Sequence, residues 1–152
     1  MKSELYSERN IQRHTREWLK GASDIFDNPI IGTLTFAYGA SASSASKQLK
    51  VLHHKLSKYV FRNAYNNHKK MVRFIPFLEG LNDDEHHIHF IVDAHHKDVH
   101  DFICKLNISW HQGIKDVEPL DKNLSEKWID YISKLKSKAR FSDALILNCT
   151  HL

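Results

Sequence analysis

The order of short β-rich and helical segments is the strongest constraint on the fold of this chain. Residues 30–36 (IIGTLTF) are apolar and β-branched, which is typical of a largely buried strand. Residues 71–79 and 86–93 have the composition of two further strands, and the polar connection 80–85 predicts that they pair as an antiparallel hairpin. Pro76 has no N–H to donate to a sheet, so we expect the second strand to lie at an edge or to carry a bulge.

Segments of helical periodicity separate these strands. A short amphipathic helix is expected over residues 6–20, ending at Gly21, and a longer helix after the small-residue loop 39–46, which can supply an N-cap. The longer helix has leucines at three- and four-residue spacing and lysines on its opposite face. The later elements expected are a short helix over 96–104, short strands around 107–110 and 114–117, a break at Pro119, and a helix over 125–138.

The resulting β-α-β-β-α-β-α order predicts the class of fold. A chain of 152 residues corresponds to a single domain, residues 1–152, which can bury a core without disulfides or a structural metal. We therefore expect an α+β domain with a ferredoxin-like or RRM-like central antiparallel sheet and flanking helices, the helices lying on one face of the sheet.

Charge is distributed unevenly along the chain. The formal net charge is +4, yet no Asp or Glu occurs between residues 41 and 78. Clusters of basic residues are typical of proteins that bind nucleic acid, and they also occur on the solvated helix faces of basic proteins. The residues of the first cluster are Lys47, Lys50, Lys55, Lys58, Arg62, Lys69, Lys70 and Arg73, and those of a second are Lys134, Lys136, Lys138 and Arg140.

The cysteines and the apolar runs bear on the compartment. Cys104 and Cys149 have neither metal-ligand nor redox spacing, so they are interpreted as thiols of a reducing compartment. No apolar run approaches the length of a membrane span, and the first residues contain no apolar signal core. We expect a cytoplasmic protein without a membrane partner.

Two histidines stand two residues apart in the expected strand 86–93. Strand alternation puts the imidazoles of His87 and His89 on one sheet face, where they can ligate one metal ion, although a chain with 12 histidines can contain such a triplet by chance. Glu79 ends the preceding strand, and hairpin pairing can bring it beside this pair. One carboxylate and two imidazoles suit Mn²⁺ or Mg²⁺ acting on phosphate. The acids at 83–85 are expected to be solvating turn residues.

A tyrosine and a lysine share one face of the last expected helix. Tyr131 and Lys134 are three positions apart, so their side chains are neighbours on the helix surface. A phenol can act as a nucleophile and form a covalent intermediate, and an ammonium beside it can stabilise negative charge. A tyrosine at the edge of the core with a solvated lysine gives the same pattern.

Taken in order, these features resemble the three motifs of HUH endonucleases of the rolling-circle replication initiator (Rep) type with a single catalytic tyrosine. The first motif, an apolar strand followed by a turn, corresponds to residues 31–36 (IGTLTF), which lack the usual aromatic–proline ending. The second, His-hydrophobic-His with an acid on the neighbouring strand, corresponds to the histidine pair and Glu79. The third, a helical YxxK, corresponds to residues 131–134. The resemblance covers residues 28–138.

The resemblance implies a mechanism and partners. A metal ion held by Glu79, His87 and His89 neutralises charge on the scissile phosphate. Tyr131, assisted by Lys134, attacks the phosphorus of single-stranded DNA or an origin hairpin, which leaves a 5′-phosphotyrosine and a free 3′-hydroxyl. The chain would be a nuclease domain without the helicase domain of many viral initiators. It would act with the polymerase and helicase of a plasmid's or virus's host, in the nucleus if the virus is eukaryotic.

The same residues leave other interpretations open. A single-tyrosine HUH transposase has a similar motif order, and a relaxase would use an N-terminal tyrosine such as Tyr6. A non-catalytic RRM-like module would explain the basic clusters, but it would not explain the combination of the histidines, the acid and the tyrosine. The basic residues of the 47–62 helix and of 136–140 are expected to contact phosphates of single-stranded DNA. The aromatic residues that could stack on bases, or pack in the core instead, are Tyr38, Tyr65 and Trp110.

Overall fold

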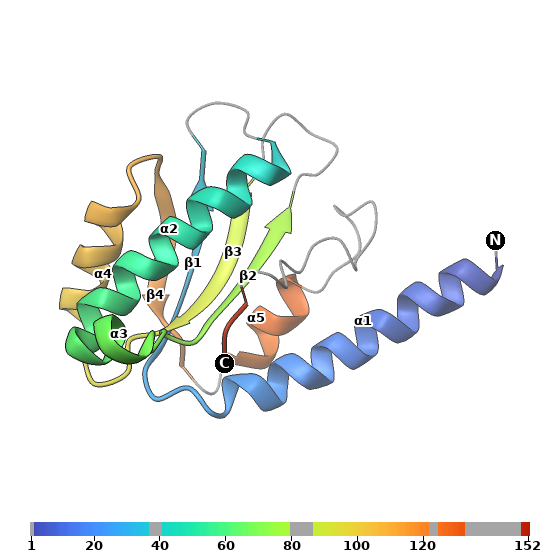
Figure 1. Cartoon of the computed structure of the whole chain (residues 1–152). Helices are drawn as coiled ribbons and strands as arrows, with labels where there is room; N and C mark the ends of the chain where they lie inside the picture. The colour runs from blue at the N-terminus through green and yellow to red at the C-terminus, as the bar shows by residue number, and fades with distance from the viewer. Residues whose placement is uncertain (1, 37–40, 80–86, 122–124, 133–149) are drawn as a thin grey trace.

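Four antiparallel strands form one sheet at the centre of the molecule (Figure 1). The strands are β1 (Pro29–Thr35), β2 (Phe74–Glu79), β3 (His87–Asp93) and β4 (Ile114–Pro119), in the spatial order β2-β3-β1-β4. β2 and β3 pair as the expected hairpin, and β2, which contains Pro76, is an edge strand as predicted. The computed structural model describes residues 2–36, 41–79, 87–121, 125–132 and 150–152.

Five helices accompany the sheet in this part of the chain. They are α1 (Lys2–Ser23), α2 (Ala42–Phe61), α3 (Asn63–His68), α4 (Val99–Ser109) and α5 (Ser125–Ile132). The expected α+β class is therefore confirmed. In Figure 1, α2 crosses one face of the sheet, and the N-terminal part of α1 extends away from it. None of these helices combines the length and the apolar character needed to cross a membrane.

Helices cover both faces of the sheet, so the prediction that they lie on one face was wrong. Leucines of α2, together with Phe102 and Leu106 of α4, pack against Leu34 and Phe90 on one face. Leu19 of α1 and Ile129 of α5 pack against Ile31 and the other alternate residues of the strands on the opposite face. The reason lies in the strands themselves: residues 88–92 of β3 read IHFIV, which places buried apolar residues on both faces of the strand.

Local sequence explains where two of the helices begin. Ser41 caps α2, since its side chain accepts a hydrogen bond of 3.2 Å from the Ser44 N–H, in agreement with the N-cap expected within 39–46. Asp98 caps α4 by accepting from the Asp101 N–H at 3.1 Å, which starts that helix three residues later than expected. The small helix α3 was not anticipated, and residues 133–138 of the expected last helix lie outside the described residues.

The strand expected at 107–110 was wrong because α4 continues through Ser109. Phe102, Leu106 and Trp110 are four residues apart and all buried. This spacing places them in one row along a helix, and burial of that row outweighs the local strand preference of the segment. The strand expected around 114–117 is present as β4, which ends at Pro119 as predicted.

A close approach in β1 explains a glycine of the strand. A Cβ atom on Gly32 would lie 2.8 Å from Cγ2 of Val117 and 2.9 Å from Cζ of Phe90, which is closer than side-chain atoms pack. Gly32 therefore leaves room for the Phe90 ring of the neighbouring strand β3.

Candidate functional site

The histidine pair of β3 lies on the sheet face that α1 and α5 cover. Ile88 and Phe90 belong to the core on the α2 side, and strand alternation directs His87 and His89 to the other side. The two imidazole rings have centroids 5.2 Å apart and are nearly perpendicular, at 89°. His89 is buried, with 7% of its surface exposed, and His87 is half-buried. Two imidazoles thus share one small region of the sheet.

Thr33 of β1 orients the ring of His89. The two residues are partners in the antiparallel β1–β3 register, and Thr33 Oγ1 lies 3.0 Å from Nδ1 of His89. In the tautomer with the proton on Nδ1, the imidazole donates to the hydroxyl and Nε2 keeps its lone pair. A second polar group that holds one ring nitrogen in this way is typical of metal-bound histidines.

Residue 79 occupies the register position directly opposite His87 in the β2–β3 hairpin. The backbone therefore brings the position of the predicted acidic ligand next to the predicted histidine ligands. The side chain of Glu79 lies outside the described part of the structure, as do the turn acids at 83–85. The ligand set Glu79, His87 and His89 stays a prediction. The β2–β3 register places position 79 opposite His87, as this ligand set requires.

A pocket of about 180 Å³ opens beside His89. Its wall includes two carboxylates of β4, Asp116 and Glu118, which sequence reasoning missed. Asp116 has a left-handed backbone conformation (φ 54°) where the β1–β4 register is irregular, between Ile31 and Thr33. Aspartate tolerates this conformation. The sequence feature that could have predicted these two carboxylates is their spacing of two residues, which places both on one face of the edge strand β4. The lining residues are Ile31, Gly32, Thr33, His89, Asp116, Glu118 and Trp128.

The helix α5 closes one side of this pocket through Trp128. Ile129 anchors α5 in the core, and the ion pairs Arg16–Asp130 and Lys20–Glu126, the latter at 3.6 Å, join it to α1. Tyr131 is the third residue after Trp128 in the same helix, and positions three apart share one helix face. The side chain of Tyr131 and all of Lys134 lie outside the described residues.

A second group of ligand-type side chains lies at the far end of β3, and sequence reasoning did not anticipate it. Asp27, Asp93 and His95 offer ligand atoms within 4.8 Å of one another. The guanidinium of Arg73 already lies there, 3.0 Å from Asp93 Oδ2 and 3.6 Å from Asp27 Oδ2. A cation thus compensates these carboxylates, and the group serves to join the ends of β1, β2 and β3.

Hydrogen bonds to the backbone support this structural role of Asp93. Its carboxylate is fully buried and accepts from the N–H groups of Asn28 (2.8 Å), His95 (2.9 Å) and Asp27 (3.0 Å). Burial by itself raises the pKa of the Asp93 carboxyl, but these backbone donors outweigh burial and hold that pKa below its ordinary value. The carboxylate is therefore charged and fully engaged.

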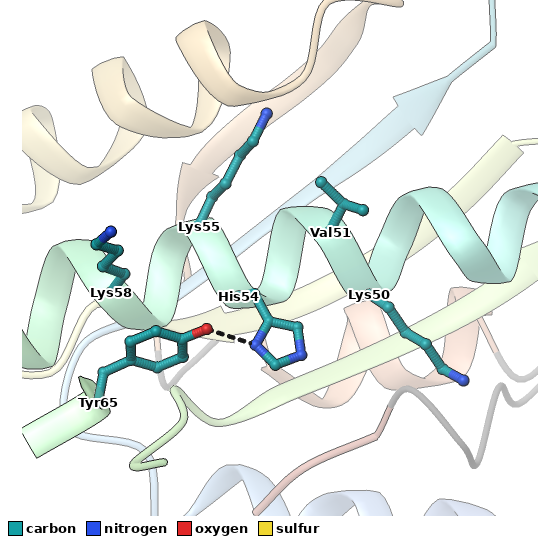
Figure 2. Close-up of a pocket in the computed structure, with 6 residues that line it drawn as sticks. All are labelled: Lys50, Val51, His54, Lys55, Lys58 and Tyr65. Atoms are coloured by element: carbon teal, nitrogen blue, oxygen red, sulfur yellow. Dashed lines mark hydrogen bonds between the residues drawn. The ribbon is translucent and has the colours of Figure 1, made fainter. Parts of the chain in front are cut away.

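The basic helix α2 lies on the opposite face of the sheet from the histidine pair. Figure 2 shows lysines of α2 around a shallow hollow on its outer surface, next to the hydrogen bond of 2.8 Å between His54 Nδ1 and the Tyr65 hydroxyl. The basic residues of this helix are expected from the sequence to contact phosphates of single-stranded DNA. The structure separates this helix from the pocket by the thickness of the sheet.

One of the aromatic residues considered for base stacking is unavailable for it. Trp110 is only 5% exposed, its indole N–H donates to the Thr35 carbonyl at 3.0 Å, and its ring packs edge-on against Phe36. A buried, hydrogen-bonded indole is part of the core, so of the two roles expected for Trp110 the structure confirms core packing and excludes base stacking. Tyr65 is half-buried, and Tyr38 lies outside the described residues.

Function has to be inferred from this geometry itself. No family model, no curated protein and no solved structure matches this chain.

Proposed function

We propose that this protein is a metal-dependent HUH-type endonuclease of the rolling-circle initiator kind, which nicks single-stranded DNA with one tyrosine. The observation that carries the proposal is the histidine pair on β3, because His89 of this pair lines a pocket that is also lined by Trp128 of α5, the helix that contains Tyr131. The fold supports it: β-α-β-β-α-β connectivity and the strand order β2-β3-β1-β4 agree with a ferredoxin-like sheet, the framework of the HUH nuclease fold.

The chemistry of the donor set fits a divalent metal ion. In the tautomer in which Nδ1 of His89 donates to Thr33, Nε2 is the ring atom that would bind a metal ion, and position 79 lies opposite His87. Glu79, His87 and His89 would hold Mn²⁺ or Mg²⁺, which supplies charge neutralisation at the scissile phosphate. The carboxylates of Asp116 and Glu118 make this pocket negative, so a phosphate requires such a cation to enter it.

Within the proposal, Tyr131 performs the covalent step. Its phenolic oxygen forms a bond to the phosphorus as the bond from phosphorus to the 3′-oxygen of the preceding nucleotide breaks. The phenol gives up its proton, and the leaving 3′-oxygen takes one up. One phosphodiester replaces another, so the reaction can run backwards and rejoin the strand. The ammonium of Lys134 stabilises the negative charge that builds on the attacking and phosphoryl oxygens.

The composition of the sheet face speaks against an RRM-like binding module. Such modules stack bases on exposed aromatic side chains of the central strands. Here β1 presents Thr33 and Thr35, and β3 presents the two histidines, while Phe77 of β2 is buried. Among the described residues, this face offers imidazoles and hydroxyls instead of a stacking platform.

Covalent adduct formation is the direct test. The protein is mixed with single-stranded oligonucleotides and Mn²⁺, and a shift in mobility on a denaturing gel reports a protein–DNA linkage. We expect an adduct on Tyr131 that depends on metal. A phosphonucleotide on Tyr6 would assign the protein to the relaxases. Binding without any adduct, across oligonucleotides that cover the encoding replicon, would favour a non-catalytic module.

A further inference from the structure

Seven exposed basic residues lie on α2 or next to α3, between positions 47 and 70. We call the seven exposed basic residues of this segment the basic face. Among the described residues, none of them forms an ion pair with a carboxylate. The cationic groups therefore stay available to an anionic partner. The basic face comprises Lys47, Lys50, Lys55, Lys58, Arg62, Lys69 and Lys70.

The spacing of these charges matches an extended partner. Lys47 and Lys58 are eleven residues apart on one helix, about 17 Å along its axis at 1.5 Å per residue. Lys50, Lys55 and Lys58 surround an open hollow of about 340 Å³ that Val51 and His54 also line (Figure 2). A row of charges of this length contacts several successive phosphates of a nucleic acid.

Two aromatic rings of this layer each have a lysine ammonium group over the ring. Lys69 Nζ lies 5.4 Å from the ring centre of Tyr65, and Lys70 Nζ lies 4.7 Å from that of Phe61. Proteins bind single strands through open aromatic rings on which bases stack, in addition to basic grooves. The basic face offers seven charges, and these two aromatic rings already interact with its lysines, which favours a backbone whose bases are paired and hidden. The charge density of a duplex, one negative charge per about 1.7 Å of axis, strengthens the match.

We infer that the basic face binds the backbone of double-stranded DNA, on the layer of the molecule opposite to the histidine pocket. This inference rests on the proposed function for the identity of the nucleic acid. According to this inference, the two faces of the sheet bind different parts of one DNA substrate. The single strand enters the pocket beside His89, and a flanking duplex or hairpin stem lies along α2. Recognition by the basic face is by charge and shape, without contacts that read sequence.

Binding to a labelled, blunt-ended DNA duplex, measured by fluorescence anisotropy in EDTA, tests the inference without any nicking. We expect K50E/K58E to weaken duplex binding about tenfold or more. Each lost contact should flatten the dependence of log K on log salt by about 0.9, or about 1.8 for two. K50Q/K58Q should give a smaller loss in the same direction. The matched control R9E/R13E makes the same change of charge on exposed positions of α1 and should bind almost as the wild type does.

Four outcomes would overturn the inference. They are duplex binding unchanged in K50E/K58E, an equal loss in R9E/R13E, a single strand of the same length bound as tightly as the duplex through the same lysines, and polyglutamate bound as tightly as DNA. Failure of the proposed function is a separate result, because it would show as the absence of a covalent adduct while the metal-free duplex measurement still decides the role of the basic face.

Discussion

Thr33 and His89 face each other across two central strands, with the threonine hydroxyl 3.0 Å from Nδ1 of the imidazole. The two residues are 56 positions apart in the sequence, and they are in contact only because β1 pairs with β3. It selects which ring nitrogen points away from the strand, so it connects the sheet register to the chemistry of the pocket.

Replacing Thr33 by Val should weaken Mn²⁺ binding about 10–100-fold, because groups that orient a ligand contribute to metal affinity on this scale. Valine has the same shape but no hydroxyl. Thr33→Ser keeps the hydroxyl and serves as the control, with affinity close to that of the wild type. Calorimetry measures the affinity, and urea unfolding shows whether stability has changed. Equal Mn²⁺ affinity in the Val and Ser variants would remove the orienting role of Thr33.

Replacing His87 or His89 by Ala should abolish metal-dependent nicking, because either change removes one of three proposed ligands. The folded state should survive, since the sheet core lies mainly in the neighbouring apolar residues. His100→Ala, at an exposed position of α4, is a matched control that should nick normally. Full nicking by either site variant at moderate Mn²⁺ concentration would refute the ligand assignment.

Glu79→Gln should lower Mn²⁺ affinity, because the amide keeps the shape of the side chain and removes its charge. The register opposite His87 motivates this choice among the local acids. The control is the triple variant D83N/D84N/E85Q in the turn, which should bind Mn²⁺ as the wild type does. The reverse pattern in calorimetry would move the acidic ligand from the strand to the turn.

Tyr131→Phe should eliminate the covalent adduct, since phenylalanine has no oxygen to attack phosphorus, while DNA binding stays nearly intact. Lys134→Ala should slow adduct formation about 10²–10³-fold without abolishing it, because an electrostatic helper contributes a few kcal/mol. Peptide mapping of the trapped adduct by mass spectrometry identifies the nucleophile. An adduct that persists in Tyr131→Phe would place the reaction on another residue.

Acid should destabilise the protein through His53, which α2 buries against β2. Its Nε2 lies 2.8 Å from the Val72 carbonyl oxygen, and its ring lies 5.8 Å from that of His151. Burial, supported by the charges of His151 and His54, lowers the pKa of His53 from 6.5 to about 4, although the bond to Val72 acts in the opposite direction.

As the pH falls, the unfolded chain binds a proton at His53 near pH 6.5, whereas the folded chain binds it only near pH 4. Stability from this group is fully present above pH 6.5 and is lost as pH falls toward 4, by up to about 3 kcal/mol. His53→Gln should flatten the pH dependence of urea unfolding between these values, and His100→Gln should leave it unchanged. A wild-type protein equally stable at pH 7 and pH 4.5 would contradict the prediction.

Local pattern was sufficient for the four strands that form and for the pairing of the histidines, although it also predicted a strand at 107–110 that is helix. The period of two along a strand is a property of the backbone alone, so His87 and His89 share a face whatever the rest of the chain does. Pro76 at an edge and a capped helix after 39–46 follow from equally local rules, the missing N–H of proline and the side-chain acceptor of Ser41. These predictions needed no knowledge of what packs where.

Only the tertiary structure decided which layer each face meets. The histidine pair lies on the face covered by α1 and α5, and the basic face lies on the other side, because two crossovers place α2 and α4 there. Strand pairing between segments far apart in the sequence brings three residues into the pocket: Thr33, Asp116 and Glu118. Trp110 is buried because α4 continues beyond the end that the sequence predicts for it. Strand alternation says which residues lie together, whereas long-range burial of apolar surface selects what covers them, and no single stretch of sequence contains that information.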